Sequence, residues 1–172
     1  MTEFAVSVVG RDRPGIIAEV TAALAELGVN LTDSSMTLLR GHFAMTLVCT
    51  GPPAPAEVRE ALNTLTADGS LLVSVGEVTD LTGPATAGRP HVVTVHGADR
   101  LGLVAAVTRT LTLAGGNITD ATSRLAGDLY LLIVEVDLPD DADTSSLTAQ
   151  LAGVGARLDV DVTLRPADPD VL

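Results

Sequence analysis

The chain has 172 residues, 47% of them hydrophobic, and a net charge of −12, and its ten basic residues are all arginine. A nucleic-acid-binding module concentrates Lys and Arg to neutralise phosphates, whereas these arginines are scattered singly, so direct DNA or RNA binding is not expected. The longest apolar runs, such as 129–134, are too short to cross a bilayer, and the N-terminus lacks the layout of a signal peptide. We therefore expect no membrane contact and a cytoplasmic location.

The first half of the chain alternates between strand-like and helical apolar spacing. Residues 2–9 are rich in β-branched residues, whereas the apolar residues from Ile16 to Leu27 recur at helical spacing. Pro14 suits the first turn of this helix, and Arg40-Gly41 is typical of a hairpin turn. The predicted elements are a strand at 2–9, a helix from Pro14 to Leu27 capped by Gly28, a hairpin of 30–39 and 42–50, a helix at 54–66 and a strand at 71–78.

The second half of the chain repeats the first. The stretch Gly10-Arg11-Asp12-Arg13-Pro14-Gly15-Ile16 is echoed 87 positions later by Gly97-Ala98-Asp99-Arg100-Leu101-Gly102-Leu103. The same offset relates further pairs: Gly28 and Gly115, Asn30 and Asn117, Thr32 and Thr119, Asp33 and Asp120, Phe43 and Tyr130, Pro52 and Pro139. One register kept for roughly forty residues indicates two copies of one module.

The second copy is predicted to have the same order of elements, with a shorter and weaker second helix. Its elements are a strand at 91–96, a helix at 101–114, a hairpin of 117–125 and 128–138 about Gly127, a helix at 144–151 and a strand at 156–164. A stretch with two Gly and two Pro separates the copies and suits an extended connection. We place the first module at 1–80, the linker at 81–90, the second module at 91–165 and a frayed tail at 166–172.

The order β-α-β-β-α-β predicts an α+β fold made of two ferredoxin-like modules. In this topology two helices cover one face of a four-stranded antiparallel sheet. The first strand carries apolar or small residues on both faces and is expected to be buried on most of both. Domains this small bury a limited share of their surface, so we expect the two halves to touch extensively.

The third strand of each module should have one buried face. In the first copy one face carries Phe43, Met45, Leu47 and Cys49, and the opposite face still carries Ala44 and Val48. In the second copy both faces are apolar, with Leu129, Leu131 and Ile133 on one and Tyr130, Leu132, Val134 and Val136 on the other. This remaining apolar surface predicts covering by the other module or by a second chain, so a homodimer is expected.

The repeated turn has the chemistry of a small-anion site. A glycine-bearing turn that enters a helix presents unpaired backbone N–H groups at the positive end of that helix. Asp12 in the turn could hold an ammonium group by charge and hydrogen bonding, which would select an amino acid over a bare anion. Asn30, at the start of the next strand, could reach such a site across a module interface.

This turn, followed by Gly28-Val29-Asn30-Leu31, resembles the signature of ACT domains, small regulatory modules that bind amino acids. The resemblance covers both copies, and the tandem arrangement without an enzyme is similar to the glycine cleavage system transcriptional repressor group. It implies a ligand at the contact between two modules. The implied contacts are Asp12, Arg13, Pro14, Gly15, Ile16 and Asn30, with Asp99, Arg100, Gly102 and Asn117 in the second copy.

The second copy departs from the signature, because Leu101 replaces the proline and Ala98 the first arginine. Its site is either degraded or serves as the other wall of the first.

Several of these residues have a purely structural alternative. Asp12 and Asp99 could cap their helices, because Asp is favoured near the first helical turn. Asn30 and Asn117 follow a glycine at a helix end, where Asn commonly satisfies the turn. The arginines of the turn, Arg13 and Arg100 included, could simply be solvated.

No catalytic or metal-binding constellation is recognised. His91 and His96 are five positions apart on one extended run and so point to opposite faces of a sheet. The single Cys49 alternates with apolar residues and is expected to be a buried thiol. No phosphate loop or dinucleotide fingerprint is found, so we expect neither a cofactor nor enzymatic activity.

Two functions remain open. The first is a regulatory sensor of a small amino acid, which the resemblance implies to be glycine or serine. This sensor would act through a regulatory protein partner, and the resemblance implies a role in the transcriptional control of amino-acid metabolism. The second is a constitutive oligomerisation or interaction module that binds no small molecule. A ligand can drive the sensor only as far as its affinities for two states differ.

Overall fold

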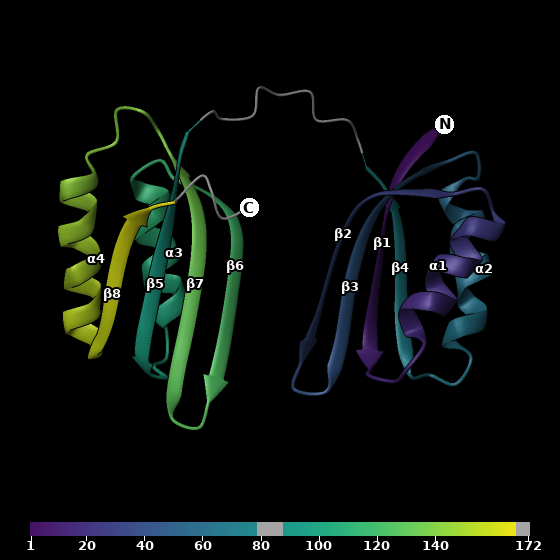
Figure 1. The fold of residues 1–172 in the computed structure, drawn as a ribbon, viewed down its shortest axis with the longest axis horizontal. Helices are drawn as coiled ribbons and strands as arrows, with labels where there is room; N and C mark the ends of the chain where they lie inside the picture. The colour runs from purple at the N-terminus through teal and green to yellow at the C-terminus, as the bar shows by residue number, and fades with distance from the viewer. Residues whose placement is uncertain (79–87, 168–172) are drawn as a thin grey trace. The chain divides into compact units, whose positions relative to one another are not determined.

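The computed structural model describes residues 1–78 and 88–167 and shows two compact units, Met1–Thr82 and Gly83–Leu172. We call them the first and second module. Each has the predicted order β-α-β-β-α-β and one four-stranded antiparallel sheet (Figure 1), with strand orders β2-β3-β1-β4 and β6-β7-β5-β8. The predicted α+β fold of two ferredoxin-like modules is confirmed.

The first module contains β1 (Thr2–Arg11), α1 (Ile16–Glu26), β2 (Asn30–Leu39), β3 (His42–Gly51), α2 (Pro55–Asn63), the 3-10 turn η1 (Thr64–Thr66) and β4 (Leu71–Glu77). The second contains β5 (Arg89–Ala98), α3 (Leu103–Leu113), β6 (Asn117–Ala126), β7 (Leu129–Leu138), α4 (Thr144–Leu158) and β8 (Val160–Pro166). None of these described helices is long and apolar enough to span a membrane.

Each module has its own core between one face of the sheet and the helices. In the first module the buried face of β3 is the predicted alternation of residues 43, 45, 47 and 49. The expectation that β1 is buried on most of both faces is wrong. Phe4, Val6 and Val8 are fully buried, but on the other face Ala5 is half-buried and Val9 is 45% exposed. The reason is that the helices cover only one face.

The second helix of the second module corrects another prediction. The sequence predicts a short helix at 144–151, but α4 has 15 residues and is longer than the other described helices. Gly153 and Gly155 interrupt the helical spacing of apolar residues in the sequence, so the helix is predicted to end before them. Gly155 is buried, and a Cβ there would lie 2.6 Å from the Val160 carbonyl oxygen, so a glycine lets α4 approach β8 closely. The last strand therefore starts at Val160, not at residue 156.

The first and last strands of the second module, β5 and β8, extend into the predicted linker and the predicted tail. The predicted linker, 81–90, lies outside the described residues up to position 87, and its end belongs to β5, which begins at Arg89. Of the predicted tail, 168–172 lies outside the described residues, whereas Pro166 ends β8 and the Ala167 amide donates to the Pro90 carbonyl at 2.9 Å. Pairing of β5 with two neighbouring strands fixes these residues.

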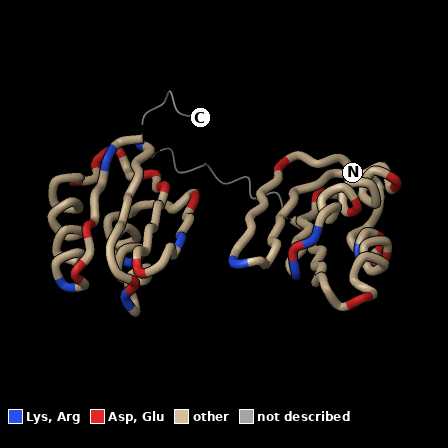
Figure 2. Tube along the Cα trace, turned by 60° about the horizontal axis from the view of Figure 1, so that its bottom comes forward, with Lys and Arg blue, Asp and Glu red and all other residues tan. Residues whose placement is uncertain are grey.

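Charged residues are spread over both modules. Figure 2 shows Asp and Glu along the described strands, helices and turns of both, with arginines placed singly among them.

Candidate functional site

The repeated turn joins β1 to α1 and β5 to α3. A glycine is required at position 10 because the chain passes close by: a Cβ there would lie 2.1 Å from the carbonyl oxygen of Ser70, just before β4. Gly15 and Gly102 are required by conformation, since both adopt the left-handed region, with φ of 94° and 82°, as the N-cap residues of α1 and α3. The repeated glycines thus shape the turn.

The backbone amides of the turn are only partly available to a ligand. The Arg11 amide donates to the Ser70 carbonyl at 3.0 Å, and the Asp12 amide to the Gly41 carbonyl at 3.1 Å. Contrary to the prediction, the turn before the helix is therefore not itself an open cradle.

The free amides are those of the first helical turn. Among residues 1–78 the amides of Ile17 and Ala18 form no hydrogen bond, and the first helical bond runs from the Glu19 amide to the Gly15 carbonyl. In the second module the Leu103 amide donates to the Arg100 carbonyl at 3.1 Å. Free amides at a helix start, where the dipole is positive, attract a carboxylate.

An open cleft adjoins the start of α1, and we call it the α1 cleft. It has a volume of about 380 Å³ and is lined by residues 12–18 together with Met36 and Phe43. The structure thus brings together the predicted contacts Asp12, Arg13, Pro14, Gly15 and Ile16. A cleft of about 490 Å³ at the start of α3 is lined by residues 99–105 and Tyr130, and it brings together Asp99, Arg100 and Gly102.

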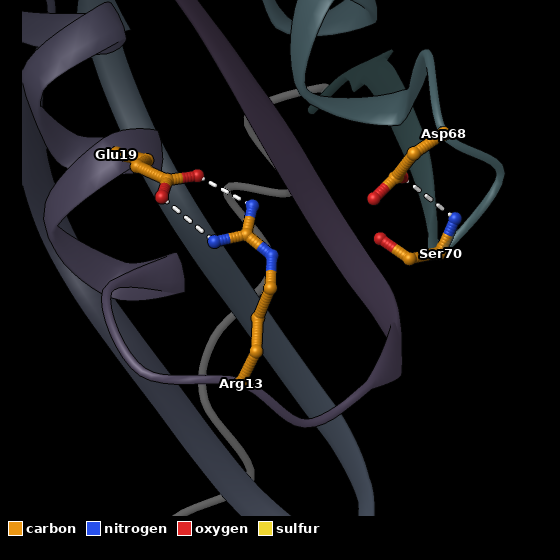
Figure 3. A network of polar contacts seen from close by, with 4 residues as sticks. All are labelled: Arg13, Glu19, Asp68 and Ser70. Carbon is orange, nitrogen blue, oxygen red and sulfur yellow. Dashed lines mark hydrogen bonds and ion pairs between the residues drawn. The ribbon is translucent and has the colours of Figure 1, made fainter.

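Arg13 forms an ion pair that the sequence analysis missed. Its Nη1 and Nη2 donate to the two carboxylate oxygens of Glu19 at 2.7 and 2.5 Å, so Arg13 lies between α1 and the loop before β4 (Figure 3). The hydrogen bond from Arg13 lowers the pKa of Glu19 below its ordinary value. The alternative of a merely solvated arginine is therefore wrong.

Arg100 makes different contacts, although it occupies the repeated position. Its Nε donates to the Leu158 carbonyl at 3.1 Å, and its Nη2 to the Asp159 carboxylate at 3.4 Å. The sequence held a signal for this difference, since the residue 87 positions after Glu19 is Ala106.

The aspartates of the turn do not cap their helices. Asp12 and Asp99 are exposed, their side chains have no partner among the described residues, and the N-caps are the glycines three positions later. The capping alternative is wrong because a turn separates each aspartate from its helix. Both carboxylates are thus available to a ligand.

Asn30 lies at the other end of its module from Asp12. It pairs with Thr50 across β2 and β3, whereas Arg11, next to Asp12, pairs with His42 at the opposite end of β3. Strands of this length span roughly 30 Å. One module therefore does not bring Asn30 and Asp12 together.

The asparagines do not satisfy the helix ends either. The helix α1 ends with backbone bonds from Gly28 to Ala25 and from Val29 to Leu24, without the Asn30 side chain. Asn117 begins β6 after a similar end, in which the Gly116 amide donates to Leu111. Both side chains are exposed, and the structural alternative is wrong for both.

The histidines and the cysteine lie as the strand alternation predicts. His91 faces the core and its Nδ1 lies 2.8 Å from the Arg89 carbonyl, whereas His96 is exposed, 3.3 Å from Asp161. Cys49 is buried, and burial raises the pKa of its thiol. The described residues include no group of three or more His, Cys, Asp or Glu that could hold a metal.

Comparison with known proteins identifies both modules. The model of the ACT domain matches residues 2–76 and 89–165. A UPF0237 protein of Listeria innocua is 38% identical over 66 residues, which are 38% of this chain and 74% of that protein.

Two solved structures span both modules. The crystal structure of a protein of unknown function from Galdieria sulphuraria superposes with a TM-score of 0.78 and 27% identity, over 97% of this chain and 99% of that one. A second, whose proposed identity is a glycine cleavage system transcriptional repressor, has a TM-score of 0.66 and 19% identity over 95% and 96%. The second likeness shows the fold alone.

Proposed function

The chain belongs to the ACT-domain family, with two ACT domains in tandem, and from this premise we propose that it is a non-catalytic regulatory protein that senses a small amino acid. The observation that carries the proposal is the α1 cleft, which combines free helix-start amides with the unpaired carboxylate of Asp12. The amides suit the carboxylate of an amino acid, and Asp12 suits its ammonium group.

The side chains of the α1 cleft favour a compact ligand. Phe43 is buried and Met36 is half-exposed, and together they give the cleft an apolar wall opposite the helix start. Glycine and serine are the ligands that the family resemblance implies. Asn30 completes the proposed site when a neighbouring ACT domain presents it, because its own module holds it at the far end.

The proposed output is a protein–protein contact. Arginines are dispersed among many acidic side chains, which does not suit phosphate binding, so a role in transcription runs through a protein partner.

The alternative function, a constitutive interaction module without a ligand, is favoured by one observation. Leu129, Leu131 and Ile133 are 53%, 36% and 37% exposed on the outer face of β7, and such a stripe suits a permanent partner.

Thermal unfolding in the presence of each of the twenty amino acids tests the proposal. A ligand of the native state raises the melting temperature with its concentration, by an amount equivalent to about 2.7 kcal/mol at a hundred times its Kd. Asp12→Ala is expected to abolish the shift, and Asp33→Ala, which removes another exposed carboxylate of the same module, to retain it. If no amino acid shifts the transition, the interaction module replaces the sensor.

A further inference from the structure

The outer face of the second module is the side of its sheet away from α3 and α4 (Figure 1). On this face Leu129, Leu131 and Ile133 form an exposed apolar stripe along β7, one of the two central strands. Val92 and Thr94 of the neighbouring strand β5 are half-buried beside the stripe. The stripe therefore forms a ridge next to a shallower groove.

Four charged side chains stand at the corners of the outer face. Cross-strand partners project from the same side of a sheet, so the register places Arg124 of β6 and Asp161 of β8 in the row of Leu131. Four residues along the same two strands lie Asp120 of β6 and Arg165 of β8. All four are exposed. Each edge strand thus carries one cation and one carboxylate, in opposite order.

We propose that the outer face of the second module binds the same face of a second copy of this chain, with a twofold axis parallel to the strands between β5 and β7. The axis brings β6 of one copy over β8 of the other, so Asp120 faces Arg165 and Arg124 faces Asp161, each pair twice. Asp161 keeps its contact with His96, 3.3 Å away, and gains the arginine. The ridge on β7 lies over the groove on β5 of the other copy.

The corner charges also select how the two sheets cross. Sheets pack face to face either nearly aligned, at about 30°, or nearly at right angles. In the aligned dimer opposite charges meet at all four corners. A twofold axis that crosses the sheets at right angles instead brings arginine opposite arginine and aspartate opposite aspartate, which is repulsive. The pattern therefore suits the aligned dimer and opposes the orthogonal one.

The sheet of the first module does not offer matching charges. By the register of its strands, the four corresponding corners hold Thr37, Asp33, Leu72 and Gly76. They provide one carboxylate for the two arginines of the outer face and no cation for its two aspartates. A second copy of the second module is thus the better electrostatic match.

The outer face is also large enough for a stable interface. Strands lie about 4.8 Å apart and rise about 3.4 Å per residue, so a sheet of this size covers roughly 500 Å² in projection. Protruding side chains raise the accessible area above this projected area, and a specific interface buries about 800 Å² of accessible surface per partner. The outer face alone comes close to that requirement.

Sedimentation of the full chain over a range of concentrations, without added amino acid, tests the dimer. The result does not depend on whether the α1 cleft binds a ligand, so the sensor proposal is tested separately by its thermal shifts. Ile133→Asp puts a carboxylate in the middle of the interface and should weaken the dimer about a hundredfold. Thr46→Asp, 87 positions earlier on the exposed face of β3, is the matched control and should leave the dimer unchanged.

A charge exchange tests the axis. Asp120→Arg and Arg165→Asp should each weaken the dimer about tenfold, because each brings like charges together at two symmetric places. The double variant restores opposite charges across the axis and should recover the wild-type affinity to within about threefold. Asp33→Arg, at the repeated position of the first module, is the control and should have no effect.

A chain that stays monomeric at all concentrations would overturn the proposal, and so would a dimer that Ile133→Asp does not weaken. A double variant that remains as weak as the single ones would rule out the proposed axis. If Asp33→Arg or Thr46→Asp weakens the dimer as strongly as the changes in the second module, then the first module carries the contact and the proposal fails.

Discussion

The two repeated turns share a motif, yet their arginines bind different elements. Arg13 is held by Glu19 of α1, whereas Arg100 reaches the end of α4 and binds Leu158 and Asp159. The second module has Ala106 where the first has Glu19, so Arg100 finds no carboxylate on its own helix. We therefore expect this one side chain to decide which way the arginine of the turn points.

The consequence lies in what each module leaves open. In the first, the arginine turns toward α1, and the loop with Asp68 and Ser70 borders an unfilled hollow. In the second, Arg100 pairs with Asp159 at the end of α4, and a smaller hollow of about 210 Å³ lies beside Asp159. Duplication has kept the backbone of the turn but not its side-chain pairs, so the two modules can differ in what they bind while sharing one fold.

The largest predicted effect concerns the close approach of the turn to the last strand. In the first module, Gly10→Ala places a Cβ against a backbone oxygen that cannot move aside, and we expect a loss of roughly 3 kcal/mol of unfolding free energy. In the second, Gly97→Ala first meets a Val160 methyl group at 2.8 Å and should cost about 2 kcal/mol.

Urea unfolding can assign each loss to its module. Tyr130 is the one tyrosine of a chain without tryptophan, so its fluorescence follows the second module, whereas circular dichroism follows both. Gly76→Ala, where nothing lies within 4 Å of the new Cβ, is the control. Equal and small losses for Gly10→Ala and this control would show that the strands do not approach as described.

A smaller effect is predicted where α4 ends. Asp159 adopts the left-handed region, with φ of 56°, and accepts a bond from Arg100. Alanine tolerates this conformation poorly, so Asp159→Ala should cost about 1 kcal/mol, while Asp159→Gly should be neutral or stabilising. Both substitutions remove the carboxylate that Arg100 binds, so the two variants differ only in how well they tolerate the left-handed conformation. Tyr130 fluorescence during urea unfolding measures the difference, and a larger loss for the glycine variant would contradict the conformational account.

The fold could be predicted because local signals agreed with one another. The repeat, the spacing of the strand and helix patterns and the turn at Arg40-Gly41 all indicate the same module. The error in α4 had a physical cause, since Gly153 and Gly155 are typical of a helix end, and only packing against β8 explains why a helix retains them.

The site could be predicted only in part. The motif identified the residues that line the α1 cleft, because they are consecutive along the chain. It could not show that the Arg11 and Asp12 amides are already bonded, or that Asp68 and Ser70 approach the turn, because these contacts join positions more than twenty residues apart. Long-range pairing is fixed by the sheet register, which a local motif does not contain.

The Arg13–Glu19 pair predicts a pH dependence that the second module lacks. The pKa of Glu19 is lowered in the folded state, so the stabilisation is complete above the ordinary pKa of glutamate, about 4.3, and is lost as the pH falls through the lowered value. Acid should therefore destabilise the wild type more than Glu19→Gln in the circular-dichroism transition. The Tyr130 transition should be the same in both, and a shift there would show that the effect is not local.

The smallest predicted effect comes from giving the second module the missing carboxylate. Ala106→Glu should draw Arg100 from Asp159 toward α3, with little change in stability because exposed ion pairs contribute only about 0–1 kcal/mol. The change should instead be seen as a lowered pKa of the new glutamate and a shifted Arg100 Nε–H resonance in NMR spectra. Ala105→Glu, on an exposed position of the same helix turn, is the matched control, and its glutamate should titrate normally. If Arg100 keeps its bond to Asp159 in Ala106→Glu, then the end of α4, and not the residue missing from α3, sets the direction of the arginine.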